Sequence, residues 1–264
     1  MLLKNKNAVI YGAGGAIGGA VARAFAREGA KVFLTGHALP PLEKVAKDIS
    51  AAGGLTETAL VDALDERAVN EHFSAIVAQG GKIDISFNAI GIAQTGVQGI
   101  PLVELSAEGF SLPIITYSRS QFLTAKIAAK HMIVRKTGVI LTLTATPSST
   151  AAPLVGGMAP AWAAVEALTR TLAKELGTDG IRVVCLRPDG IPETDTITEV
   201  FGLHAQGAGM KSHKEFQSLM ESMTLLKRLP TLAEVANTAA FIASDLASAI
   251  TGTVVNLSCG SIVD

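Results

Sequence analysis

Short apolar stretches alternate with longer amphipathic stretches along the whole 264-residue chain. Most of the short stretches are apolar at nearly every position, which is typical of parallel strands covered by helices on both faces. They predict strands over residues 7–11, 31–35, 57–61, 83–87, 138–143, 181–186 and 253–257. The longer stretches repeat their apolar positions every three or four residues. They predict helices over residues 16–28, 41–51, 66–79, 106–134, 159–176 and 231–244.

Strands and helices that alternate with short connections predict βαβ units. The expected fold class is therefore α/β, a single Rossmann-type domain over residues 1–264. Its seven strands should form a doubly wound, mostly parallel sheet with helices on both faces. Residues 195–222 are less regular and lie between the sixth strand and the last helix. This segment is either a mobile lid over a substrate site or a pair of surface helices.

The composition supports a large buried core, with 48% hydrophobic and 17% charged residues. A formal net charge of -1 without a basic block gives no electrostatic basis for binding nucleic acid or an anionic membrane. No apolar run approaches the roughly 20 residues that a membrane-spanning helix needs. Cys185 and Cys259 lack the spacing of a metal site and are expected to be buried, reduced thiols. These features predict a cytoplasmic protein without a metal centre.

A glycine-rich turn joins the first predicted strand to the first helix, in the stretch AVIYGAGGAIGGAVARAFAREGA. Glycines let backbone N–H groups approach a pyrophosphate, and the start of a helix adds a favourable dipole potential. The position at the first strand–helix junction of a βαβ series favours a dinucleotide site over a turn that only serves packing. The residues expected to contact a cofactor here are Gly12, Gly14, Gly15, Ile17 and Gly18.

Four motifs in the same order resemble the short-chain dehydrogenase/reductase family along nearly the whole chain. The glycine turn is similar to the family's TGxxxGxG, with Tyr11 in place of the threonine and Ala16 in place of the middle glycine. The stretch FNAIG resembles the family's NNAG and keeps Asn88 and Gly91. AAVEALTRTLAKELGTDGIRVVCLRP resembles the family's fifth helix and sixth strand, and RLPTLAEVANTAAFIASDLASAITGTVVNLSCG its C-terminal helix and last strand.

The resemblance implies an NAD(P)-dependent oxidoreductase that assembles as a homodimer or homotetramer through helices 106–134 and 159–176. It also implies cofactor contacts from Pro188 and Thr194 after the sixth strand. Asp62 stands where the family has an aspartate near the adenine, although it could equally be a local turn residue.

The end of the second strand, FLTGHA, bears on the choice between NADP and NAD. An acidic side chain there would bind the adenosine ribose of NAD, and a basic one the 2′-phosphate of NADP. No acid is present, and His37 stands where NADP-dependent relatives often have arginine, which slightly favours NADP. A neutral imidazole is a poor partner for phosphate, and His37 could equally be an ordinary surface residue.

The family's catalytic residues are missing. Active members use a tyrosine as general acid, a lysine that lowers its pKa and a serine that binds the carbonyl group. Alignment with the family places Ala145, Met158 and Trp162 at the serine, tyrosine and lysine positions. Tyr117 falls at a catalytic asparagine. No Tyr-x-x-x-Lys occurs anywhere in the chain, so no shift of the alignment restores the motif. Ala16 and the bulk of Trp162 also put cofactor binding in question.

Other residues could supply the chemistry. Asp189 and Glu193 could act as carboxylate bases after the sixth strand, or they could cap the turn and the next helix. Tyr117 could act as an acid, or it could be a buried core tyrosine. His204 and His213 are further candidates for a proton donor in the irregular segment.

Three functions therefore stay open. The first is an NAD(P)-dependent oxidoreductase of divergent mechanism that acts on a small carbonyl or alcohol substrate. The second is a catalytically inactive dinucleotide-binding or partner protein. The third is a non-redox enzyme, such as a lyase or hydrolase, that reuses the pocket.

Overall fold

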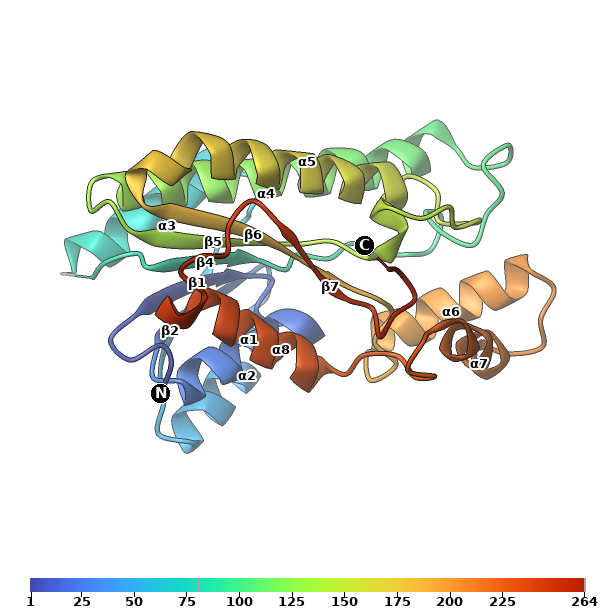
Figure 1. The fold of residues 1–264 in the computed structure, drawn as a ribbon, viewed down its shortest axis with the longest axis horizontal. Coiled ribbons are helices and arrows are strands. Elements are labelled where there is room, and N and C mark those ends of the chain that lie inside the picture. Colours follow the sequence, from blue (N-terminus) through green and yellow to red (C-terminus); the bar gives the residue numbers. More distant parts are fainter. Residues whose placement is uncertain (80, 264) are drawn as a thin grey trace.

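The computed structural model describes residues 1–79 and 81–263 and confirms the α/β fold. Seven strands form one sheet in the order β3-β2-β1-β4-β5-β6-β7 (Figure 1). They are β1 (Asn7–Tyr11), β2 (Lys31–Gly36), β3 (Leu55–Leu60), β4 (Ile85–Asn88), β5 (Gly138–Leu143), β6 (Ile181–Pro188) and β7 (Val254–Leu257). The prediction was a mostly parallel sheet, and all six strand pairings are parallel.

Helices cover both faces of the sheet, with α1, α2 and α8 on one face and α3, α4 and α5 on the other (Figure 1). The helices are α1 (Ala16–Arg27), α2 (Leu39–Ala51), α3 (Glu66–Ala78), α4 (Ala107–Ile133), α5 (Met158–Leu176), α6 (Asp195–Gly207), α7 (His213–Met223) and α8 (Leu232–Ala243). The strand order reverses between β1 and β4, and ligands bind at such a reversal, beyond the carboxyl ends of the strands. No helix in the described residues has the length and apolar character needed to cross a membrane.

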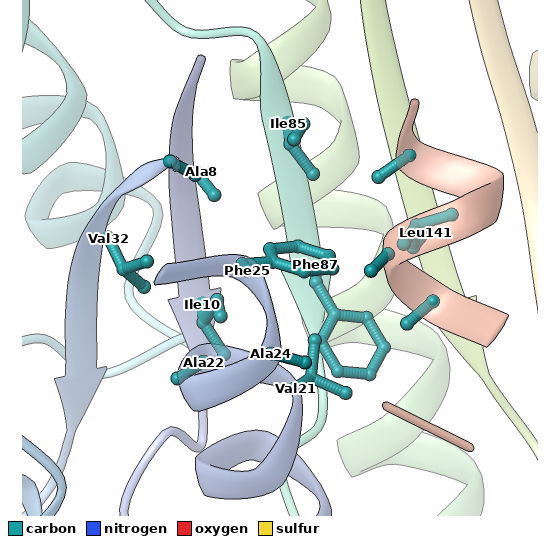
Figure 2. Packing of buried hydrophobic residues seen from close by; sticks show 14 of the residues in the cluster. Ala8, Ile10, Val21, Ala22, Ala24, Phe25, Val32, Ile85, Phe87 and Leu141 are labelled. Carbon is teal, nitrogen blue, oxygen red and sulfur yellow. The ribbon is translucent and has the colours of Figure 1, made fainter. Parts of the chain in front are cut away.

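The core on the α1 face shows why the first motif folds as predicted. Val21, Ala22 and Phe25 lie on one side of α1 and are fully buried. They pack toward Ile10 of β1 and Phe87 of β4 (Figure 2). Burying an aliphatic or aromatic side chain contributes roughly 1.5–3 kcal/mol. The helix is therefore fixed against the two strands that flank the reversal.

The burial of the strands falls from the centre of the sheet toward its ends. All four residues of β4 are buried, whereas Leu55 and Leu60 of β3 are exposed. β3 has a neighbour on one side only, because it is the last strand of the sheet. Cys185 is buried in β6 as expected. The expectation is wrong for Cys259, which is only partly buried because β7 already ends at Leu257.

The irregular segment 195–222 forms the helix pair α6 and α7, one of the two expected alternatives. Thr194 and Ser212 accept hydrogen bonds at the two helix starts, from the N–H groups of Ile197 and Glu215. Three residues of α6 are buried, but none of the 11 residues of α7 is. The pair projects from the end of the sheet (Figure 1).

Candidate cofactor and active site

The glycine turn is packed so tightly that two of its positions accept only glycine. Gly12 has a φ of 71°, and a Cβ on it would lie 2.5 Å from the carbonyl oxygen of Ala89. A Cβ on Gly18 would collide with the carbonyl oxygen of Gly12. Without side chains at these positions, the start of α1 lies directly against the ends of β1 and β4.

The N-terminus of α1 is suited to an anion. No side chain caps the helix at Gly15, and its first turn holds no acidic residue. The first N–H groups of a helix and its dipole together favour a phosphate. Gly14 and Gly15 lie in the turn and Ile17 lies in the first turn of α1. This geometry fits the pyrophosphate of a dinucleotide. Ala16 is exposed, so its methyl group takes no part in the packing of the core.

His37 and Asp62 come together beyond the ends of β2 and β3. Nε2 of His37 lies 3.7 Å from Oδ1 of Asp62, and both side chains are about half exposed or more. The same carboxylate oxygen accepts a hydrogen bond from the backbone N–H of Leu64 at 2.8 Å. Asp62 is therefore a turn residue that also contacts His37, and the two side chains form one polar surface near the turn.

Asn88 and Gly91 lie on the other side of the reversal and differ in accessibility. The Asn88 side chain is buried, donates to the Thr124 hydroxyl at 3.1 Å and accepts from the N–H of Ile90. The amide of Gln121 also donates to the Asn88 carbonyl, at 3.0 Å. Asn88 is thus used to fix the loop after β4. A Cβ on Gly91 would meet nothing within 4 Å, so this position faces open space.

The middle of the candidate site is apolar and aromatic. Tyr117 and Met158 are buried and Trp162 is half-buried against the same small core. The ring centroids of Tyr117 and Trp162 are 6.4 Å apart. We call Tyr117, Met158 and Trp162, with the surrounding Val97 and Val155, the aromatic cluster. Burial raises the pKa of Tyr117 to about 12, although a backbone hydrogen bond with Ile92 opposes the rise. At neutral pH this phenol is a very weak acid.

A buried ion pair lies one helical turn below Trp162, and sequence reasoning missed it. Glu166 of α5 and Arg187 of β6 are 3.6 Å apart, with side chains 7% and 4% exposed. The Glu166 carboxylate also accepts hydrogen bonds from the hydroxyls of Thr144 and Ser148. Ser148 belongs to a short 3-10 turn, η1 (Thr146–Ser148), which follows Ala145. The only signal in the sequence was a charged residue on the apolar side of a predicted helix.

Asp189 lies at the end of β6 and is also buried. Its carboxylate accepts hydrogen bonds from the hydroxyls of Thr146 and Ser261, at 3.3 and 2.5 Å, and from the N–H of Gly190 at 2.7 Å. Glu166 and Asp189 together therefore hold both ends of η1. Pro188, the last residue of β6, precedes this turn.

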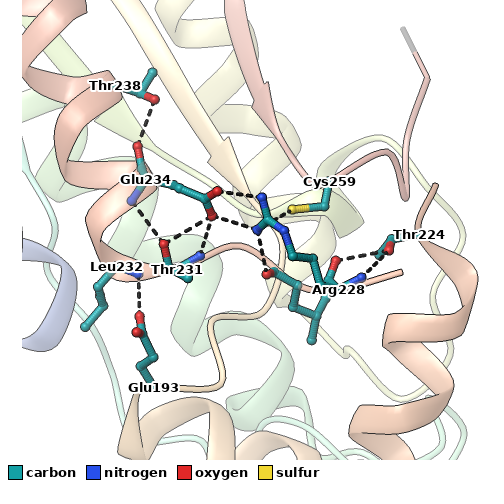
Figure 3. A network of polar contacts seen from close by, with 9 residues as sticks. Glu193, Thr224, Arg228, Thr231, Leu232, Glu234, Thr238 and Cys259 are labelled. Atoms are coloured by element: carbon teal, nitrogen blue, oxygen red, sulfur yellow. Dashed lines mark hydrogen bonds and ion pairs between the residues drawn. The ribbon is translucent and has the colours of Figure 1, made fainter. Parts of the chain in front are cut away.

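Thr194 and Glu193 both act at helix starts. The Thr194 hydroxyl donates to the carbonyl of Ile191 at 3.0 Å in addition to capping α6. Glu193 is exposed and accepts a hydrogen bond from the N–H of Leu232 at 2.6 Å, at the start of α8 (Figure 3). These contacts agree with the capping alternative. A catalytic role for either Asp189 or Glu193 stays a prediction.

An apolar pocket of about 560 Å³ opens beside the aromatic cluster. It is lined by Pro101, Leu102, Phe110, residues 150–156, Ala159 and Pro160. Its described lining contains one hydroxyl, that of Thr150, and no charged side chain. Small-molecule sites have comparable volumes and are mostly apolar.

A model of the enoyl-(acyl carrier protein) reductase family matches residues 12–261. The chain belongs to the short-chain dehydrogenase/reductase family. This membership implies an NAD(P)-dependent oxidoreductase.

Two relatives resemble this chain in sequence over nearly its whole length. The uncharacterized oxidoreductase YxbG of Bacillus subtilis is 33% identical, over 95% of this chain and 88% of its own length. The peroxisomal 2,4-dienoyl-CoA reductase of Rattus norvegicus is 32% identical, over 98% of this chain and 85% of its own.

Solved structures show the same fold. The NAD+-bound xylitol dehydrogenase has a TM-score of 0.92 at 23% identity, with 98% of this chain and 100% of that chain covered. Levodione reductase has a TM-score of 0.87 at 27% identity, with 97% of each chain covered.

Proposed function

We propose that this member of the family transfers hydride between NAD(P) and a small apolar substrate without the usual tyrosine and lysine. The glycine turn carries the proposal, since its two crowded glycines and uncapped helix start keep the geometry of a pyrophosphate site. The bound nicotinamide would supply the hydride. The protein would then position the substrate and exclude water.

The proton that accompanies the hydride needs a different source in this chain. Tyr117 has a pKa of about 12, and Glu166 is paired with Arg187. Tyr117 therefore does not readily give up its proton at neutral pH, and the Glu166 carboxylate is already engaged by Arg187 and by the hydroxyls of Thr144 and Ser148. We propose that water, admitted through the open side at Gly91, supplies it.

The pocket beside the aromatic cluster supports an uncharged, apolar substrate. A charged group placed there would lose its hydration without gaining an ionic partner from the lining. The small carbonyl or alcohol substrate expected from the sequence would place its apolar part among lining residues such as Leu102, Phe110 and Pro160.

The same weak proton supply favours a second reaction, the reduction of a carbon–carbon double bond conjugated to a carbonyl group. Hydride addition to a ketone leaves a strongly basic alkoxide that must be protonated at once. Addition to a conjugated double bond leaves an enolate, whose charge is delocalised and whose carbon takes a proton later. The dienoyl-CoA reductase named above acts on a substrate of this type.

Nucleotide binding tests the proposal first. We expect micromolar affinity for NADPH, NADH or both in a titration followed by nucleotide fluorescence and calorimetry. No binding at millimolar nucleotide would overturn it and would leave a cofactor-free function. NADP is slightly favoured at His37, although the Asp62 carboxylate 3.7 Å away would repel a 2′-phosphate. Comparing 2′,5′-ADP with ADP measures this preference directly.

Deuterium transfer then separates the two reactions. NADPH deuterated at C4 is incubated with apolar ketones and with conjugated enoyl thioesters, and the products are analysed by mass spectrometry. Label at the carbonyl carbon indicates a carbonyl reductase, and label at the β-carbon indicates double-bond reduction. Restoring the family's pair with M158Y and W162K provides the control. It should raise carbonyl reduction by roughly 10²–10⁴-fold and leave double-bond reduction nearly unchanged.

Nucleotide binding without turnover of any substrate would instead support an inactive dinucleotide-binding or partner protein.

We also propose that the chain works in the cytoplasm as a homodimer or homotetramer. The exposed Phe110, Leu112, Ile115 and Phe122 of α4 support assembly through this helix. Light scattering of the purified protein measures the oligomeric state.

A further inference from the structure

Three buried polar side chains connect the α6–α7 pair to the loop after β4. Gln94, Gln98 and His204 are 3%, 4% and 7% exposed. His204 Nε2 lies 3.2 Å from Gln98 Oε1, Gln98 Nε2 donates to Gln94 Oε1 at 2.6 Å, and Gln94 Nε2 donates to the Ile92 carbonyl at 2.6 Å. We call these three residues the glutamine–histidine chain.

The Ile92 carbonyl fixes the direction of every hydrogen bond in this chain. A carbonyl oxygen can only accept, so Gln94 must turn its NH₂ group toward Ile92 and its oxygen toward Gln98. Gln98 must then donate to Gln94 and present its own oxygen to His204. His204 therefore carries its proton on Nε2. Burial lowers the pKa of His204, which agrees with a neutral ring that donates from this nitrogen.

The glutamine–histidine chain ends beside the aromatic cluster. The backbone of Ile92, which accepts the last hydrogen bond, also forms the hydrogen bond with Tyr117. Val97, next to Gln98 in the sequence, packs in the same small core as Tyr117 and Trp162. A shift of Gln98 would therefore reach Trp162 through packed neighbours.

The α6–α7 pair buries few of its residues, although Gly207 of α6 lies close to Gly99 and Leu154 of the body. α7 buries none of its 11 residues, and α6 buries only Phe201, His204 and Ala205. Phe201 packs against Phe216 of α7, with ring centroids 5.4 Å apart, so part of this burial lies within the pair. Thr95 and Glu199 form a second link between the loop and α6, a hydrogen bond of 3.0 Å that is exposed. Segments with few buried contacts open at a low cost in free energy.

We propose that Gln98 is a positioning residue that holds the α6–α7 pair closed over the loop after β4. If the pair moved away, Gln98 Oε1 and His204 Nε2 would both lose their buried partner. The bond between Gln98 and Gln94 lies within the loop and holds the Gln98 side chain in place. The α6–α7 pair opens as one unit when the contact between Gln98 and His204 breaks, and this opening exposes the aromatic cluster. This opening requires neither bound nucleotide nor catalysis.

The protein contains a natural fluorescence reporter, because Trp162 is its single tryptophan. Quenching of its fluorescence by acrylamide measures how often the cluster is exposed. We expect Q98L and H204L to raise the quenching constant about twofold or more, because each removes a buried contact of the closed state. H204Q keeps an N–H donor for Gln98 and should remain close to the original protein. T95V removes only the exposed link between the same two segments and serves as the matched control.

Hydrogen exchange of the unmodified protein provides a test that does not depend on any variant. The amides of α6 should exchange faster than those of α8, and those of α6 and α7 should open together. Equal exchange in α6 and α8 would overturn the proposal, because the pair would then open only with the whole domain. Unchanged quenching in folded Q98L and H204L, or an equal rise in T95V, would overturn it as well.

Discussion

The two halves of the candidate site beyond the strand ends are built in different ways. At the glycine turn, backbone contacts leave no room for a side chain on Gly12 or Gly18, and no side chain caps the start of α1. At the α4–α5 face, Tyr117, Met158 and Trp162 pack as core residues, above a buried ion pair. The first half depends on backbone geometry and the second on side-chain chemistry. The replacement of catalytic residues proposed above would therefore change the second half without disturbing the first.

The largest expected effect concerns the buried pair beneath the second half. R187M leaves the Glu166 carboxylate buried without its cation, which should lower the free energy of unfolding by about 3–5 kcal/mol. Urea unfolding measures this loss. The double variant E166L/R187M removes both charges and should recover most of it. Nucleotide affinity of the folded fraction should stay the same, because the glycine turn lies on the other side of the reversal. If R187M weakened nucleotide binding as well as lowering the free energy of unfolding, the two halves would not be independent.

The second largest effect is expected at the glycine turn. G12A places a side chain at a φ of 71° and against the carbonyl of Ala89. G53A is the matched control, since Gly53 has a φ of 79° but nothing within 4 Å of its Cβ direction. The left-handed conformation should cost about 1–2 kcal/mol in both variants, measured by urea unfolding. The collision should cost about 1–3 kcal/mol more in G12A alone.

Nucleotide titration of the same two variants completes this test. G12A should also weaken binding at least about tenfold, because even a small displacement of the turn misaligns its N–H donors. G53A should bind as the original protein does. Equal nucleotide affinity in all three proteins would contradict the assignment of the turn.

A third effect separates Tyr117 as a core residue from Tyr117 as an acid. Its pKa is raised from 10.0 to about 12, so the folded state holds the phenol proton more tightly than the unfolded state. The resulting stability is complete below pH 10 and is lost as the pH rises toward 12, by roughly 2–3 kcal/mol. Y117F should lack this part of the decline in urea unfolding between pH 9 and 12. A catalytic phenol would instead shift the pH profile of turnover in Y117F near neutral pH.

The smallest effect lies outside both halves, at the start of α8. Arg228 holds the pKa of Glu234 down to about 2, with help from the N–H and hydroxyl of Thr231 (Figure 3). This stabilisation is present above pH 4.5 and is lost as the pH falls toward 2. R228A should lower the melting temperature near neutral pH and make thermal unfolding less sensitive to acid between pH 4.5 and 2, because the folded and unfolded pKa values of Glu234 then converge. R228K keeps a cation and should keep the original pH dependence. Because the pair is exposed, the change should be smaller than those above and should fade at high salt.

The sequence was most informative where a local pattern determines a local structure. The bounds of β1 and β5 match their apolar runs. The glycine-rich stretch predicted a tight turn, and the structure has one at Gly12 and Gly18. No local sequence pattern predicted the ion pair of Glu166 and Arg187, because a contact between a helix and a strand forms only when the two elements pack. The same holds for Gln98 and His204. Alignment predicted that the usual catalytic residues are absent, but only packing shows what lies around Met158 and Trp162.

The outer strand β3 has a consequence for the behaviour of the protein in concentrated solution. Its free side presents unpaired backbone groups and the exposed Leu55 and Leu60, which could extend the sheet into another molecule. Glu57 lies in the middle of this strand and pairs with Lys31 at 2.6 Å. A charged side chain at this place discourages a second strand from docking. Replacing Glu57 with valine would therefore favour ordered aggregation of the folded domain without changing the candidate site.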